Sequence, residues 1–175
     1  TEYREGVFVG YRYYDKKNMD VLFPFGYGLS YTTFEYSNLT LDKSEMKDTD
    51  TLTVSVNVRN TGKVKGKEVV QLYVGMPESH TIRPVKELRG FEKIELEPGE
   101  EKTVTFTLAK RAFAYYRTDI SDWYVESGDY TIMAAKSSRD IACTATVNVT
   151  STTQIKRVYT MNSTIEEIME SPVGR

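Results

Sequence analysis

The chain has 175 residues, with 23 Lys or Arg against 25 Asp or Glu and a formal net charge of −2. This balance gives no general case for nucleic acid or an anionic membrane as a partner, and no apolar run is long enough to cross a bilayer. A single cysteine excludes an internal disulfide, and a single histidine leaves little room for a histidine-based metal site or catalytic triad. We therefore expect no cofactor and no metal.

Residues 1–31 are unusually aromatic, and six of the thirteen tyrosines lie there. The stretch has neither the 3.6-residue period of a helix nor the alternation of a strand, and Pro24, Gly26 and Gly28 are typical of a loop. The sequence therefore predicts an irregular aromatic extension. Because aromatic rings bury a large apolar area when they find a partner, we expect this extension to pack against other structure, much of it outside these 175 residues.

From about residue 32 to 150 the sequence predicts short strands separated by turns. Residues 51–60 place Leu or Val at every second position, which is typical of a half-buried antiparallel strand. Residues 68–75 are apolar on both faces, as in a central strand. Four further strands are expected, at 88–96, 103–108, 130–134 and 141–149, and 110–114 fits one helical turn. About seven short strands with regular turns predict an all-β, two-sheet β-sandwich of immunoglobulin or fibronectin type III-like type.

The last segment, 151–175, has a different texture. Ser163 and Glu166 fit a capping box, apolar residues follow at helical spacing, and Pro172 would end the helix. The sequence predicts a short helix near 163–170. A helix of this length is marginal alone, so we expect it to dock or to be followed by more chain.

Several motifs carry a family resemblance. They are, in chain order, residues 5–15 (EGVFVGYRYYD), 23–34 (FPFGYGLSYTTF), 56–62 (VNVRNTG), 66–74 (GKEVVQLYV), 83–91 (RPVKELRGF) and 96–100 (LEPGE). The first two resemble the segment of glycoside hydrolase family 3 enzymes that leaves their α/β sandwich domain. The others resemble the fibronectin type III-like domain that closes those enzymes, which are mainly β-glucosidases, with β-xylosidases and N-acetylglucosaminidases beside them.

The resemblance implies that the chemistry lies elsewhere. Members of this family use an aspartate nucleophile on a (β/α)8 barrel and a glutamate acid/base on the α/β sandwich domain, both upstream of the matched segment. The chain then consists of a linker (1–31), a fibronectin type III-like sandwich (32–150) and a C-terminal extension (151–175). Its expected partners are the upstream catalytic domains of the same polypeptide, with an oligosaccharide as a further candidate. The compartment stays open, with a cytoplasmic bacterial location favoured over secretion.

The triplet Ser121-Asp122-Trp123 also occurs around the nucleophile of the family. Its context here is the end of the fibronectin-like domain, where the tryptophan packs and a glycine turns. Retaining hydrolysis also needs a second carboxyl group about 5 Å away, and nothing in the sequence marks one. We therefore interpret Asp122 as structural and expect no catalytic residue in this chain.

The tyrosine-rich run at 11–15 has two interpretations. Sugars stack on exposed aromatic rings, so Tyr11, Arg12, Tyr14 and Asp15 could form a substrate subsite. Aromatic residues mixed with arginine are also typical of interface cores, and the run could then be an interdomain seam in which Arg12 pairs with a carboxylate such as Asp15. We favour the seam.

Histidine and cysteine often take part in catalysis or metal binding, but His80 and Cys143 are interpreted here without such a role. His80 lies in a turn-rich loop and is expected to be solvated, although this loop could approach an active-site mouth in an intact enzyme. Cys143 alternates with core residues and is expected to be a small buried hydrophobe.

Overall fold

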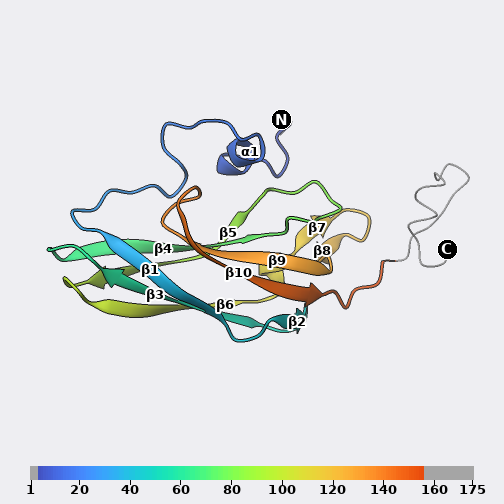
Figure 1. Ribbon diagram of the computed structural model, residues 1–175. Coiled ribbons are helices and arrows are strands. Elements are labelled where there is room, and N and C mark those ends of the chain that lie inside the picture. The colour runs from blue at the N-terminus through green and yellow to red at the C-terminus, as the bar shows by residue number, and fades with distance from the viewer. Residues whose placement is uncertain (1–3, 156–175) are drawn as a thin grey trace, which may run out of the picture.

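The computed structural model describes residues 4–155. Figure 1 shows two β-sheets stacked face to face, with the N-terminal segment lying over one side of the sandwich. The helix expected near 163–170 lies outside the described residues. Within residues 4–155, no helix has the length and apolar character needed to cross a membrane.

Ten strands form three sheets in the described part of the chain. The smaller sheet of the sandwich has the order β1 (Phe34–Leu41), β3 (Leu52–Asn60), β6 (Glu101–Leu108). The larger sheet has the order β2 (Glu45–Lys47), β10 (Ile141–Thr150), β9 (Gly128–Ala135), β4 (Gly66–Gly75), β5 (Glu87–Leu96). A small hairpin at one end pairs β7 (Tyr115–Arg117) with β8 (Asp122–Tyr124). The all-β sandwich is therefore confirmed.

The core lies between the two sheets and follows the alternation of the sequence. In β3 the side chains of Leu52, Val54, Val56 and Val58 are fully buried while their neighbours are not. Period-2 burial of branched side chains is what a sheet with one solvated face requires. The helical turn predicted at 110–114 is present as α2 (Lys110–Phe113), which follows β6 and buries Phe113.

Strand β4 is buried on both faces, and the two faces have different partners. Val70, Leu72 and Val74 belong to the core cluster between the sheets. Gln71 and Tyr73 alternate with them and are also buried, although they point to the opposite face. The N-terminal extension covers this second face, as the contacts described below show.

The extension contains a helix that the sequence did not predict. Residues 11–16 form α1 (Tyr11–Lys16), which follows Gly10 at φ 62° and lies above the sheet near β5 (Figure 1). The expectation of an entirely irregular segment was wrong. A helix of fewer than two turns presents too few residues for a 3.6-residue period to show, and contacts with the sandwich stabilise it in place of an amphipathic stripe.

Candidate functional site

Tyr11 attaches the extension to the larger sheet. Its hydroxyl oxygen accepts a hydrogen bond of 2.8 Å from the backbone N–H of Leu88 in β5. Its ring stacks on Phe25 with 4.5 Å between centroids and meets the ring of Tyr73 edge-on at 6.1 Å. Both ring arrangements are favourable for aromatic pairs. Tyr11 is therefore part of a packed contact between α1, the 22–31 segment and β4.

Asp15 is the charged centre of the same contact. Its side chain is only 6% exposed, and Arg139 Nε lies 3.1 Å from Oδ1. Lys86 Nζ lies 2.9 Å from Oδ2, which makes an ion pair without the alignment of a hydrogen bond. Arg139 also donates to the carbonyl oxygen of Met19 at 2.6 Å. Asp15 thus joins α1 to the loop before β5 and to the turn between β9 and β10.

Arg12 pairs with a carboxylate, as expected, but the carboxylate is that of Glu87 and not that of Asp15. Its guanidinium donates to the carbonyl oxygen of Val7 at 3.2 Å and lies 3.7 Å from the carboxylate of Glu87. Residues 12 and 15 sit three apart on a single short turn of helix, and Asp15 is already held by cations from outside that helix. The charged side chains of α1 thus pair with residues of the sandwich that are far away in the sequence.

Tyr14 differs from the other three candidates. Its ring meets Tyr13 edge-on at 6.0 Å, and its side chain is exposed. Together with Tyr11 and Asp15 it lines a small cavity of about 210 Å³ beneath α1. The structure therefore brings three of the four candidates around one hollow and turns Arg12 toward β5.

Gln71 is a residue of this contact that the sequence analysis missed. Its side-chain Nε2 donates to the carbonyl oxygens of Gly26 at 2.9 Å and Lys136 at 2.7 Å, and its Oε1 accepts from the hydroxyl of Tyr73 at 2.7 Å. The signal was available, since a glutamine inside an apolar strand must find partners when it is buried. Burial also raises the pKa of Tyr73, with the neighbouring Tyr11 and Asp15 adding to the effect.

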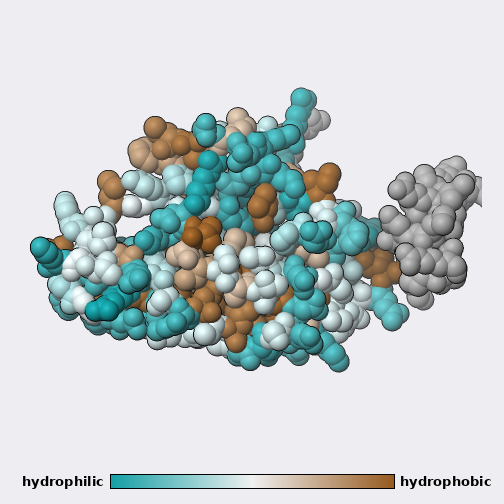
Figure 2. Space-filling view, viewed as in Figure 1, coloured by the Kyte–Doolittle hydropathy of each residue, from teal (hydrophilic) through white to brown (hydrophobic). Residues whose placement is uncertain are grey.

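Much of the apolar surface of the extension is uncovered. Leu22 is 89% exposed, Leu29 88% and Tyr31 100%. Other large apolar side chains of the extension are also exposed, and these are Val7, Val9, Tyr13, Tyr14, Met19, Phe23, Phe25 and Tyr27. Figure 2 shows brown side chains gathered at one end of the extension, at the upper left of the view. An apolar patch of this kind marks an interaction surface.

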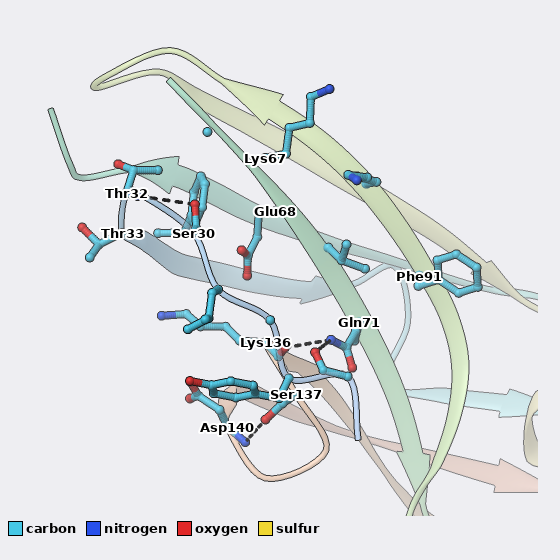
Figure 3. A pocket seen from close by; sticks show the side chains of 18 of the residues that line it. Ser30, Thr32, Thr33, Lys67, Glu68, Gln71, Phe91, Lys136, Ser137 and Asp140 are labelled. Carbon is cyan, nitrogen blue, oxygen red and sulfur yellow. Dashed lines mark hydrogen bonds between the residues drawn. The ribbon is translucent and has the colours of Figure 1, made fainter. Parts of the chain in front are cut away.

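A groove separates the inner side of the extension from the sandwich. It encloses about 1230 Å³ between residues 24–34, the ends of β4 and β5, and the turn at 136–140. Figure 3 shows polar side chains lining it, with Ser30 and Thr32 near one end and Phe91 toward the other.

Asp122 has the surroundings of a surface turn. Ser121 before it has φ 51°, the side chain of Asp122 is exposed, and its Oδ1 accepts from the N–H of Trp123 at 2.7 Å. Across the β7–β8 hairpin its backbone faces Arg117. Trp123 is packed between the guanidinium of Arg111 and the ring of Tyr116. These contacts support the structural interpretation of the triplet.

His80 has a partner and is not simply solvated. Its side chain is 89% exposed, yet Nδ1 lies 2.6 Å from Glu126 Oε1, and its backbone N–H donates to the same oxygen at 2.8 Å. Ser79 Oγ donates to the other carboxylate oxygen at 2.7 Å. Burial alone would raise the pKa of Glu126, but these hydrogen bonds outweigh it and lower the pKa. The carboxylate thus holds the β4–β5 loop against the end of the sandwich.

The loop contact predicts a pH dependence. Because the folded-state pKa of Glu126 lies below its unfolded value of about 4.3, its contribution to stability is complete above that pH and is lost as the pH falls through the folded value. We expect Glu126→Gln to lower the melting temperature at pH 7 and the difference from wild type to shrink toward about pH 3. A difference that stayed constant over this range would contradict the assignment.

The sequence predicted a buried side chain for Cys143, whereas the structure shows it half-buried. It packs against the core cluster, and burial raises the pKa of its thiol. Within residues 4–155, no group of three or more His, Cys, Asp or Glu side chains is arranged to hold a metal ion.

The sheet order, the two-sided strand β4 and the buried branched core define an immunoglobulin-like sandwich of fibronectin type III type. The family of fibronectin type III-like domains matches residues 68–138. A thermostable β-glucosidase B of Acetivibrio thermocellus is 58% identical over 169 residues, which is 97% of this chain and 22% of that protein. The structure of a family 3 β-glucosidase of Bifidobacterium adolescentis superposes with a TM-score of 0.86 at 42% identity, covering 97% of this chain and 25% of that one. The chain is therefore the C-terminal fibronectin type III-like region of a glycoside hydrolase family 3 enzyme.

The matches cover only part of each relative, and the relatives differ in the activity that their names give. The chain spans about a fifth of the length of the relatives that it matches. They do not share one specificity, since an exo-α-(1→6)-L-arabinopyranosidase of Bifidobacterium breve is 51% identical over 84% of this chain and 19% of its own length.

Proposed function

We propose that this chain is a non-catalytic domain that stabilises the catalytic domains of a β-glucosidase-type glycoside hydrolase, with residues 1–31 as the seam between them. The observation that carries the proposal is the uncovered apolar face of the extension. The extension is held to the sandwich by Tyr11, Asp15 and Gln71, yet it exposes Leu22, Leu29 and other large apolar side chains to water.

The same geometry argues against chemistry in the chain itself. A retaining glycosidase needs two carboxyl groups about 5 Å apart with a sugar pocket between them. Asp15 is paired with two cations, Glu126 accepts hydrogen bonds from the β4–β5 loop, and Asp122 lies exposed on a hairpin. The parent reaction, hydrolysis of an O-glycosidic bond of a β-glucoside, is proposed for upstream catalytic domains of the same polypeptide.

The test compares the isolated chain with the hydrolase that carries it. We expect the isolated chain to fold and to cleave no aryl β-glucoside. The double variant Leu22→Ser/Leu29→Ser should lower the temperature at which this region unfolds within the whole enzyme by a few degrees, since one or two kcal/mol of lost burial has this effect on a unit of about 150–250 residues. The same variant should leave the melting temperature of the isolated chain unchanged.

Two results would contradict the proposal. One is turnover by the isolated chain that disappears in Asp122→Asn. The other is a whole enzyme that keeps its full stability, solubility and activity after this region is deleted. A role in protein interaction or oligomerisation is the competing class, and it would show as self-association of the whole enzyme that depends on Leu22 and Leu29.

A further inference from the structure

Three arginines gather where α1 meets the start of β5, and they have one carboxylate between them. Arg12 comes from α1, Arg83 from the β4–β5 loop and Arg89 from β5. Arg89 Nη2 lies 2.7 Å from Glu87 Oε2, and Arg12 Nη1 lies 3.7 Å from Glu87 Oε1. Arg83 has no carboxylate partner within residues 4–155, and its Nη2 donates to the carbonyl oxygen of Phe113 at 3.1 Å.

The excess positive charge of this arginine cluster is partly removed from water. The side chain of Arg12 is 37% exposed and that of Arg89 only 20%. Burial lowers the pKa of Arg89, and the charges of Arg83 and Arg12 lower it further, against the opposite effect of Glu87. A desolvated cation without a full counter-charge costs free energy. The cluster therefore lacks an anion.

The hydrogen-bond donors of the cluster are also largely unused. A guanidinium has five N–H donors, yet in the part of the chain between residues 4 and 155 Arg12 donates only to the carbonyl oxygen of Val7, and Arg89 only to Glu87. The Nε atoms of both arginines are buried without a partner. The nearby carboxylate of Asp15 is already paired with Lys86 and Arg139, so these donors have no further acceptor in the described structure.

The cluster is surrounded by exposed apolar side chains. Val7, whose carbonyl oxygen Arg12 contacts, is 54% exposed. In the loop before β5, Ile82 is 79% exposed and Val85 49%. Arginine among apolar side chains is typical of the centre of a protein interface. A small anion from solution would leave these apolar side chains uncovered, so the surroundings favour a protein carboxylate as the missing counter-charge.

We propose that Arg12 and Arg89, with the charge of Arg83 beside them, bind the carboxylate of an Asp or Glu side chain of the upstream catalytic domains. The inference rests on the proposed function and names the chemistry of the partner. The relatives of this chain have about four fifths of their length outside the matched region, which supplies such a partner in the same polypeptide. The loop before β5 then belongs to the seam together with residues 1–31.

The test compares Arg12→Gln in the isolated chain and in the whole enzyme. In the isolated chain Glu87 keeps Arg89 and glutamine can still donate to Val7, so the melting temperature should stay the same or rise slightly as repulsion is relieved. In the whole enzyme the temperature at which this region unfolds should fall by about 5 °C or more, because the partner carboxylate stays buried without its cation.

Three control variants in the whole enzyme separate charge from packing. Arg12→Lys keeps the charge and should recover most of the loss. Arg12→Glu places two carboxylates against each other and should roughly double it. Arg59→Gln removes an exposed arginine of β3, in the other sheet, and should change nothing.

Two results would overturn the inference. An equal loss for Arg12→Gln in the isolated chain and in the whole enzyme would show that Arg12 serves only the fold of this chain. A whole enzyme unaffected by Arg12→Gln but destabilised by Leu22→Ser/Leu29→Ser would reject the anionic partner and leave the stabilising role intact. If neither variant destabilised the whole enzyme, the stabilising role itself would be rejected.

Discussion

Replacing Asp15 by Ala is expected to lower the free energy of unfolding of the chain by about 3 kcal/mol, because removing one partner of a buried ion pair leaves the other charge uncompensated. Lys86 is 12% exposed and Arg139 is partly buried, and both would lose the carboxylate that they share. Urea denaturation at pH 7, followed by circular dichroism, would measure the change as a lower midpoint.

The matched control is Asp119→Ala, which removes the partner of Arg117 on the β7–β8 turn. The Arg117–Asp119 pair is shorter, with contacts of 2.6 and 2.9 Å, but it is exposed. Exposed pairs contribute little because water and salt screen them, so the midpoint should barely move. Equal shifts for the two variants would show that Asp15 is only a surface charge, and Asp15 would then be free to serve as the sugar subsite that we considered from the sequence.

The sandwich could be predicted because its signal is local. The alternation in 51–60 and the apolar run in 68–75 each describe how a strand meets the core, and neither depends on which strand lies beside it. The family motifs then gave the context in which Asp122 was interpreted as structural. In both cases the information lay within about ten neighbouring residues.

The sequence indicated that residues 11–15 form an interface, but it did not indicate which residues they contact. Aromatic and charged residues in 11–15 indicated an interface, yet the partners of Tyr11 and Asp15 come from β5 and the β9–β10 turn, far along the chain. The residues around Asp15 in the sequence do not show that its carboxylate pairs with Lys86 and not with Arg12. The helix α1 was missed for the same reason, since its stability comes from those distant contacts and not from its own six residues.

The loop around His80 shows a similar limit. A single histidine among turn residues carries no sign of its partner, and Glu126 lies in the turn before β9, on the other side of β5 and β6 in the sequence. A buried carboxylate always needs donors, but only the fold shows that Ser79 and His80 provide them.

Gln71→Leu is expected to destabilise the chain by about 3 kcal/mol, since it leaves buried polar groups unsatisfied at about 1–3 kcal/mol each. The carbonyl oxygens of Gly26 and Lys136 and the hydroxyl of Tyr73 would all lose their partner. Leucine is similar in volume and suits an apolar strand, so loss of packing would not explain the effect. Chemical denaturation gives the free energy, and hydrogen exchange of the 24–31 amides would show whether the extension opens first.

Two further variants separate the contributions of this contact. Tyr73→Phe removes only the hydroxyl that donates to Gln71 and should cost about 1 kcal/mol. Gly26→Ala should lower the free energy of unfolding nearly as much as Gln71→Leu. Gly26 has φ 77°, and an added Cβ would collide with the Gln71 side chain. If Gln71→Leu cost no more than Tyr73→Phe, the hydrogen bonds from the Gln71 amide to Gly26 and Lys136 would not be what holds the 24–31 segment against β4.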